Sequence, residues 1–183
     1  MKKNIKIAGF CGSLRKESFN NKILALAGEL LPDNMELIQI TFDTVPLYNE
    51  DIDTATPPVA VAALREALAS VDGILIVSPE YNHAMPGGLK NALDWASRGA
   101  NNPLAGKPVS LIGATLGMWG TARMQASFLT FFHLMNMPVV ARPEVLINLV
   151  STKFDENGNF TDETTKKLMR QNLENLQSLI LAK

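Results

Sequence analysis

The stretch that decides the fold is Asp72-Gly-Ile-Leu-Ile-Val-Ser-Pro-Glu-Tyr-Asn-His-Ala-Met-Pro-Gly-Gly-Leu-Lys-Asn-Ala-Leu-Asp-Trp95. Residues 73–77 are apolar throughout, which predicts a parallel strand buried on both faces. Residues 78–88 contain two prolines and two glycines, which stiffen the backbone and let it approach a flat ligand closely. A helix over about 88–97 follows. We therefore predict a buried strand, a rigid ligand-binding loop and a helix, in that order.

The rest of the chain alternates between short β-like runs and runs with helical period, which predicts a parallel sheet with helices on both faces. We expect strands at 5–10, 35–40, 73–77, 108–114 and about 139–147, the last interrupted by Pro143. Pro57-Pro58 is expected to open the second helix, and Thr161 to cap the last one. This order indicates an α/β, doubly wound, flavodoxin-like three-layer sandwich with strand order 2-1-3-4-5. With no linker or repeat, residues 1–183 are expected to form one domain.

The composition excludes several classes of protein. Hydrophobic residues make up 46% and charged residues 19% of the 183, and the net charge is −1, so nothing suggests a nucleic acid or a membrane as partner. No apolar run approaches the roughly 18 residues that span a bilayer. The apolar stretch 5–11 is short and lacks a cleavage site, so it indicates a strand rather than a signal peptide. A single cysteine, Cys11, excludes an internal disulfide or a multi-cysteine metal site and is expected to be a buried filler. We expect a cytoplasmic protein.

The loop after the first strand, 12–20, has the components of a phosphate site. It offers the hydroxyls of Ser13 and Ser18, the amide of Asn20, the guanidinium of Arg15 and free N–H groups at a helix start. It is neither a Walker loop nor a Gly-x-Gly-x-x-Gly dinucleotide motif. The alternative is an ordinary polar turn in which Ser18 or Asn20 only caps the helix.

Two further loops follow the third and fourth strands. In the loop 78–88 the alternative to ligand binding is a Pro/Gly turn with Tyr81 packed on the surface. In the loop 114–120, Gly117 and Gly120 permit close backbone approach and Trp119 offers a flat wall, and the alternative is an ordinary helix start. Because doubly wound sheets bind ligands at the carboxyl ends of their strands, we expect all three loops to form one site.

The chain resembles the NADPH-dependent FMN reductases, a flavodoxin-like group that includes chromate, quinone and azo-dye reductases. The resemblance covers about residues 4–150. It rests on Gly12-Ser-Leu-Arg-Lys-x-Ser-x-Asn20, on Pro79-Glu-Tyr-Asn-x-x-x-Pro-Gly-x-Leu-Lys-Asn-Ala-x-Asp-Trp95, and on Gly117-x-x-Gly120 followed by Ala122-Arg-x-Gln125. The sequence departs from the family at Gly120-Thr121, where Gly-Gly is frequent, and at His83, where tyrosine is frequent.

The resemblance implies FMN as the cofactor and NADPH or NADH as the hydride donor. It places the FMN phosphate on the first loop, the flavin ring on the second, and the edge of the ring against the third. The residues implied to bind the cofactor are Ser13, Arg15, Ser18, Phe19, Asn20, Pro79, Glu80, Tyr81, Asn82, His83, Thr115 and Gly117. No catalytic side chain and no metal are implied, because the flavin carries the chemistry.

The implied function is an NAD(P)H-dependent reductase that transfers hydride through flavin N5 to quinone, azo, chromate or flavin acceptors in a ping-pong cycle. The alternatives are a non-catalytic electron carrier like flavodoxin and a redox sensor that holds FMN. A balance of 17 basic and 18 acidic residues, with Arg15 in the first loop, argues against a carrier, because carriers tend to be strongly acidic. The physiological acceptor and the choice between NADPH and NADH stay open.

Several other residues give weaker expectations. Met118, Trp119, Met124 and Phe128 could form a partner surface, which predicts a homodimer or homotetramer, unless they pack within their own helix pair. Glu80, Lys90 and Asp94 are expected to form a polar cluster under the second loop. Arg98 is a candidate contact for a nicotinamide phosphate or a neighbouring subunit.

Overall fold

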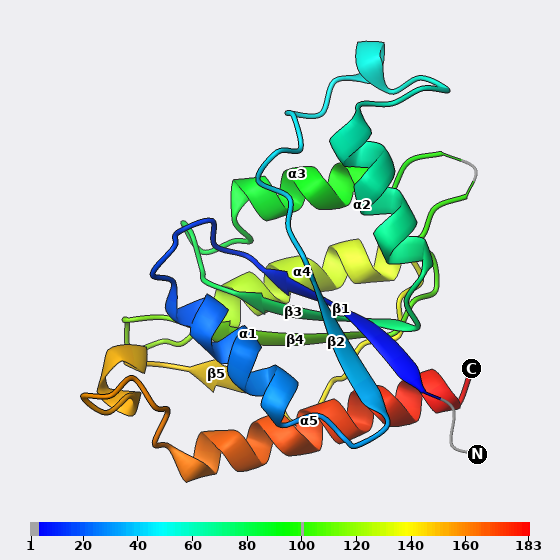
Figure 1. Ribbon diagram of the computed structural model, residues 1–183. Helices are drawn as coiled ribbons and strands as arrows, with labels where there is room; N and C mark the ends of the chain where they lie inside the picture. Colours follow the sequence, from blue (N-terminus) through cyan, green and yellow to red (C-terminus); the bar gives the residue numbers. More distant parts are fainter. Residues whose placement is uncertain (1–3, 100) are drawn as a thin grey trace.

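A computed structural model describes residues 4–99 and 101–183 and contains one sheet of five parallel strands (Figure 1). The strands are β1 (Ile5–Cys11), β2 (Met35–Ile40), β3 (Gly73–Ser78), β4 (Val109–Ala114) and β5 (Val145–Ile147). Their order across the sheet is β2-β1-β3-β4-β5, and every neighbouring pair is parallel. The predicted fold class and strand order are therefore confirmed.

Five α-helices cover the two faces of this sheet (Figure 1). They are α1 (Phe19–Glu29), α2 (Val59–Ala69), α3 (Gly87–Ala96), α4 (Ala122–Leu134) and α5 (Glu163–Leu181), with short 3-10 helices at η1 (Glu50–Ile52) and η2 (Val150–Lys153). Helices α1 and α5 share one apolar core with the sheet, and α2, α3 and α4 share the other. The result is the predicted three-layer arrangement.

Strand β3 separates these two cores. All six of its residues are buried, and successive side chains alternate between the cores, with Leu75 and Val77 toward α1 and Ile74 and Ile76 toward α3 and α4. The apolar run in the sequence was therefore a correct sign of a central strand.

The predicted fifth strand was too long. Only Val145–Ile147 forms the strand, and Val139 makes a single isolated bridge to Val109. Pro143 lies between these two segments and cannot donate a backbone hydrogen bond to a ladder, so the pairing cannot run continuously.

The predicted cap of the last helix was also wrong. Asp162, not Thr161, is the N-cap of α5 and accepts from the N–H of Thr165 at 3.1 Å, while the Thr161 hydroxyl donates to the carbonyl of Lys153. The side chain of Lys153 pairs with Asp162, and this hydrogen bond, outweighing burial, lowers the pKa of Asp162 to about 2. A carboxylate at this position also interacts favourably with the helix dipole.

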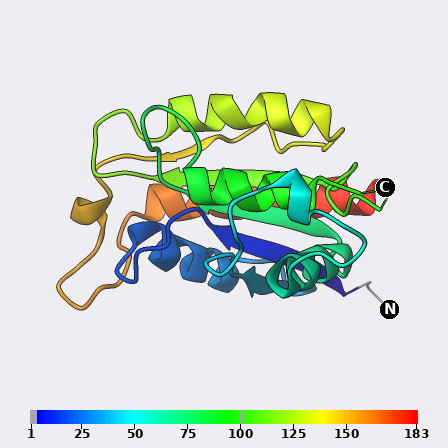
Figure 2. The same ribbon diagram turned by 90° about the horizontal axis from the view of Figure 1, so that it is seen from above.

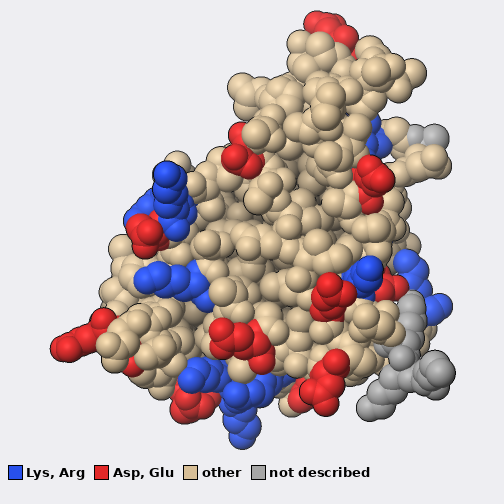
Figure 3. All heavy atoms as spheres, viewed as in Figure 1, with Lys and Arg blue, Asp and Glu red and all other residues tan. Residues whose placement is uncertain are grey.

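The loops that follow β1, β3 and β4 gather at one edge of the sheet, at the carboxyl ends of the strands (Figures 1 and 2). On the face drawn in Figure 3, acidic and basic side chains are interspersed rather than gathered by sign. Among the residues that the structure describes, no helix is both long and apolar enough to cross a membrane. The edge with the three loops is where the fold predicts a ligand.

Candidate functional site

A cavity of about 160 Å³ opens between these three loops. Nine of the twelve predicted site residues line it, namely Ser13, Arg15, Ser18, Phe19, Asn20, Pro79, Glu80, Tyr81 and Thr115. The sequence reasoning did not include three other lining residues, which are Ala114, Leu116 and Val150. The predicted residues Asn82, His83 and Gly117 lie in the same loops but do not line the cavity.

The first loop can lie close to β3 because Gly12 has no side chain. The Gly12 N–H donates to the carbonyl of Val77 at 2.8 Å, and a Cβ at Gly12 would lie only 2.2 Å from the Ser78 hydroxyl. This close approach brings the start of the loop under the cavity. Any larger residue at Gly12 would push the phosphate-type donors away from the other two loops.

The start of α1 supplies donors to this cavity. Ser18 occupies the N-cap position, yet its side chain caps no N–H of the helix, so the first N–H groups are left without a side-chain partner. Ser13 and Ser18 are both buried, and the Ser13 hydroxyl accepts from the N–H of Arg15 at 3.3 Å. Hydroxyls, a guanidinium and a helix N-terminus converge here, which is a donor set suited to a phosphate.

Cys11 lies beneath this loop as the buried filler that its position predicted. Its thiol donates to the carbonyl of Ser13, and burial raises its pKa despite hydrogen bonds from that loop. The neutral thiol is poorly suited to nucleophilic or redox chemistry.

Asn20 lines the cavity and also joins two of the loops. Its side-chain amide donates to the carbonyl of Ala114 at 2.9 Å and its side-chain oxygen accepts from the N–H of Ala114 at 3.0 Å. The side chain is buried and pairs with the end of β4 as a neighbouring strand would. Asn20 therefore ties the first loop to the third.

The second loop contains a tight turn that is formed by residues other than its prolines and glycines. Tyr81 and Ala84 exchange two backbone hydrogen bonds, of 3.1 and 3.0 Å, around Asn82 and His83. Both central residues have left-handed backbone, with φ of 49° and 64°. Asparagine and histidine both adopt this conformation more often than most other non-glycine residues. The turn leaves Tyr81 46% exposed at the mouth of the cavity.

Glu80 fastens the second loop to the N-terminus of α4. One carboxylate oxygen accepts from the N–H of Met124 at 2.9 Å and the other lies 3.1 Å from Nδ1 of His83. Burial acts to raise the pKa of Glu80, but these hydrogen bonds outweigh it and hold the pKa below its ordinary value. The N–H of Met85 adds a second tie to α4 through the hydroxyl of Ser127, at 3.2 Å.

The predicted polar cluster of Glu80 with Lys90 and Asp94 does not form. Lys90 pairs instead with Asp94 at 2.6 Å on the outer surface of α3, because the two residues are one helical turn apart. Arg98 lies over the ring of Tyr48 at 5.0 Å, away from the cavity. Lys90, Asp94 and Arg98 do not line the cavity.

The third loop is joined to the segment after β5. Thr115 donates its N–H to Ile147 and accepts from the N–H of Val150, and Gly117 accepts from the N–H of Leu149. These bonds bring Val150 into the cavity wall. No local sequence signal marks Val150, because it reaches the site only through the pairing of β4 with β5.

The aromatic and methionine residues near this loop divide into two groups. Met118 and Trp119 are 69% and 77% exposed, and the guanidinium of Arg123 lies 5.6 Å from the centre of the Trp119 ring. Met124 and Phe128 are fully buried in the core, so the expectation that they form a partner surface was wrong. They occupy the inward face of α4, where packing against the sheet buries them.

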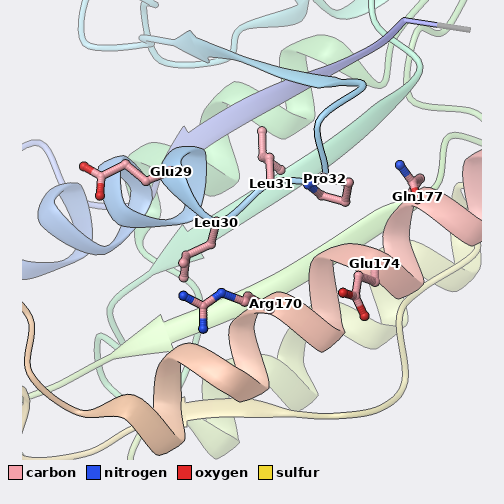
Figure 4. Close-up of a pocket in the computed structure, with 7 residues that line it drawn as sticks. All are labelled: Glu29, Leu30, Leu31, Pro32, Arg170, Glu174 and Gln177. Carbon is pink, nitrogen blue, oxygen red and sulfur yellow. The ribbon is translucent and has the colours of Figure 1, made fainter. Parts of the chain in front are cut away.

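A larger cavity, of about 480 Å³, lies between the end of α1 and α5 (Figure 4). It is lined by Glu29, Leu30, Leu31, Pro32, Arg170, Glu174 and Gln177. This cavity precedes β2 and so lies at the amino ends of the strands, opposite the three loops. Its charged side chains are of both signs, and it is not the site that the fold predicts.

The lining of the small cavity combines phosphate-type donors with apolar surface. The phosphate-type donors come from Ser13, Arg15 and the start of α1, while Pro79, Tyr81 and Leu116 provide apolar surface nearby. Its side chains provide binding and orientation rather than a nucleophile and a base.

Comparisons with known proteins agree with this geometry. A model of the family described as NADPH-dependent FMN reductase matches residues 5–152. An NAD(P)H-dependent FMN reductase of Pseudomonas aeruginosa is 38% identical over 177 residues, which are 97% of this chain and 96% of that protein. A 2-hydroxy-1,4-benzoquinone reductase of a Burkholderia species is 38% identical over 167 residues, 91% of each chain. The solved structure of FerB, a flavoenzyme NAD(P)H:(acceptor) oxidoreductase from Paracoccus denitrificans, matches with a TM-score of 0.89 and 31% identity, covering 97% of this chain and 98% of that one.

Proposed function

Because the chain belongs to the NADPH-dependent FMN reductase family, and is thus an FMN-dependent oxidoreductase that uses NAD(P)H, we propose that it reduces quinone-type acceptors in a ping-pong cycle. In such a cycle the oxidised donor leaves before the acceptor enters, so one mouth of the site serves both. Bound FMN supplies the hydride chemistry itself. The residues of this chain bind the cofactor, orient it and admit its reaction partners. We also propose a cytoplasmic location, on the evidence of the single cysteine.

The observation that carries the proposal is the meeting of nine predicted residues in one cavity at the carboxyl ends of the strands. We assign the phosphate to Ser13, Arg15, Ser18 and the start of α1, which together offer hydroxyl, guanidinium and backbone donors. Phe19 and Thr115 complete that end of the cavity.

We assign the ring to the backbone of the second and third loops. Pro79 and Tyr81 form one wall, and the turn at Asn82 and His83 supports Tyr81 from behind. Gly117 lies beside Thr115 in the third loop, where its N–H donates to the Thr115 hydroxyl at 3.2 Å. Asn20 and Glu80 act as positioning residues, since each ties two of these elements together.

Quinones are the acceptors that the mouth of the cavity suits best. Tyr81, Leu116, Met118 and Trp119 are exposed there or in the adjoining loop, so the approach is apolar and open. Such a surface accepts flat rings and does not discriminate strongly among them, which extends the proposal to azo compounds and free flavin in vitro. The open approach also leaves room for a small oxyanion such as chromate. The Burkholderia relative is named for a benzoquinone substrate.

Two measurements test this function against a carrier and a sensor. The visible absorption of the purified protein, with chromatography of the released cofactor, identifies FMN. Anaerobic mixing of the protein with NADPH then measures the first half of the cycle. Mixing of the reduced protein with 1,4-benzoquinone measures the second half. Two fast half-reactions and parallel double-reciprocal plots support the reductase. Slow reduction by NAD(P)H would instead indicate a carrier or a sensor.

We further propose a homodimer or homotetramer. Met118 and Trp119 supply exposed apolar surface beside the cavity, and a second copy of the chain would cover it. The arrangement would narrow a site that is otherwise open at its rim.

A further inference from the structure

Arg15 lies where three cavities meet. It lines the small cavity described above, a second cavity of about 320 Å³ that also contacts Tyr81, and a third of about 320 Å³ at the ends of β1 and β2. The second and third cavities share Leu14 as well as Arg15. Because the second and third cavities share these residues, they lie next to one another, and we call the two together the trough; its lining extends from Tyr81, at the mouth of the site, to Asp43 beyond the end of β2. We call the third cavity the β2-end cavity.

The β2-end cavity has the side chains that a phosphorylated nucleoside requires. Its lining residues are Cys11, Ser13, Leu14, Arg15, Lys16, Asn21, Gln39, Ile40, Thr41, Phe42 and Asp43. Two cations offer charge to a phosphate, and the amides, the two hydroxyls and the carboxylate offer partners for sugar hydroxyls. Leu14, Ile40 and Phe42 add apolar surface for a base.

The cations of this cavity are available to a ligand. Within the described part of the chain, neither Arg15 nor Lys16 forms an ion pair, and both side chains belong to exposed residues. Arg15 also lines the small cavity, where the FMN phosphate is assigned, whereas Lys16 lines only the β2-end cavity. Lys16 is therefore the cation of the trough that the cofactor does not use.

In the middle of the trough the lining includes two glycines, which have no side chains. Gly87 and Gly88 line it, a Cβ at Gly87 would meet nothing within 4 Å, and one at Gly88 would only touch Phe42 and Leu14 at ordinary distances. Space is thus left for an elongated ligand to pass from Tyr81 toward the end of β2. A nicotinamide dinucleotide has this form, because its two halves are joined by a flexible pyrophosphate.

We propose that the β2-end cavity binds the adenosine half of the dinucleotide donor, and that Lys16 contacts the 2′-phosphate which distinguishes NADPH from NADH. This inference rests on the proposed function. If the nicotinamide lies at the flavin beside Tyr81, the rest of the donor can lie along the trough, past Leu14. Its adenosine end then reaches Lys16, the cation of the trough that is not assigned to FMN. The protein then prefers NADPH, and Lys16 is the residue that sets the preference.

The test uses the FMN-loaded protein and the probe adenosine 2′,5′-bisphosphate, titrated by calorimetry. We expect the probe to bind and to compete with NADPH, and Lys16→Gln to weaken it about tenfold, as the loss of an exposed charge-assisted contact would. Lys16→Gln should raise KM for NADPH by about the same factor, change KM for NADH less than about twofold, and leave kcat and the Kd of FMN unchanged. Lys167→Gln, an exposed lysine on α5, is the matched control and should change none of these.

A second variant tests the cavity without removing charge. Thr41 is exposed at the rim of the β2-end cavity, so Thr41→Trp fills the space and should weaken the probe and both dinucleotides. Unchanged probe binding in both Lys16→Gln and Thr41→Trp would overturn the inference, as would equal loss of NADH and NADPH in Lys16→Gln. A failure of the proposed function gives a different result, since the wild-type protein would then oxidise neither dinucleotide.

Discussion

Replacement of Glu80 tests whether the second loop and α4 hold the site together as one unit. In Glu80→Ala the N–H of Met124 loses a charged acceptor at 2.9 Å and His83 loses its partner at 3.1 Å. A hydrogen bond to a charged group contributes about 1.5–3 kcal/mol, and an exposed pair with histidine adds about 0.5 kcal/mol or less. We expect the free energy of unfolding to fall by about 2–3 kcal/mol, which corresponds to a Tm lower by about 4–12 °C for a chain of this size.

The assay is urea unfolding followed by fluorescence, together with FMN titration of the apoprotein. Glu80→Gln keeps one acceptor oxygen and should lose only about 1 kcal/mol. Lys90→Gln removes an exposed ion pair on α3 and is the control, with an expected loss below about 0.5 kcal/mol. Because the pKa of Glu80 is lowered on folding, its stabilisation is present above its unfolded pKa and is lost as the pH falls through the folded value. The difference between wild type and Glu80→Ala must therefore shrink in acid. Equal stability of Glu80→Ala and Lys90→Gln at pH 7 would refute the reasoning.

Four further predictions test other parts of the site and fold. Arg15→Ala should weaken FMN by about tenfold or more in a titration while leaving the circular dichroism unchanged, and an unaltered Kd would remove Arg15 from the site. Asn82→Ala should cost about 1 kcal/mol through its left-handed backbone and slow anaerobic reduction of the flavin-saturated protein by NADPH, whereas Asn82→Gly keeps the turn and reduces at nearly the wild-type rate. Light scattering at micromolar concentration should show a dimer or tetramer that Trp119→Glu dissociates, and a wild-type monomer would contradict the proposed oligomer. Because the pKa of Asp162 is about 2 in the folded protein and about 3.9 in an unfolded chain, its stabilisation should be complete above about pH 5 and lost as the pH falls toward about 2, and Asp162→Asn should flatten the acid limb of a stability–pH curve.

The parts of the fold that the sequence predicted well are those set by burial alone. The apolar run of β3 and the alternation of short strands with helices depend on which residues avoid water, and they indicated the doubly wound fold, whose flavodoxin-like strand order is the one that the sheet has. The location of the site followed from that order, because the carboxyl ends of parallel strands bring the loops after β1, β3 and β4 to one edge.

The inward face of a helix is harder to predict where alanine is abundant. In α2, Ala62 and Ala63 are exposed, and the buried residues are Val61, Leu64 and Leu68. Alanine has too little surface to fix which face turns inward, so the larger side chains decide the rotation of the helix. The same reason explains Met124 and Phe128, which are large, lie on the inward face of α4 and are buried there.

The roles of Asn20 and Glu80 could not be predicted from the sequence because they depend on partners far along the chain. Asn20 bonds to Ala114, 94 positions away, and Glu80 to Met124, 44 positions away. Both partners are backbone groups, which every residue has, so no pattern of side chains in the sequence indicates which residues they belong to. A motif shows that these residues belong to the site and does not show whether they touch the ligand or another loop.

These two ties determine how the site should respond to mutation. Asn20 fixes the first loop to β4 and Glu80 fixes the second loop to α4, so the walls of the cavity are set before a ligand enters. Binding to a preformed cavity avoids the cost of ordering the loops, and affinity then depends on the donors that face the ligand. Substitutions of Arg15 should therefore change FMN affinity with little change in stability. Substitutions of Asn20 or Glu80 should change both together, because the folding of the loops and the shape of the cavity depend on the same hydrogen bonds.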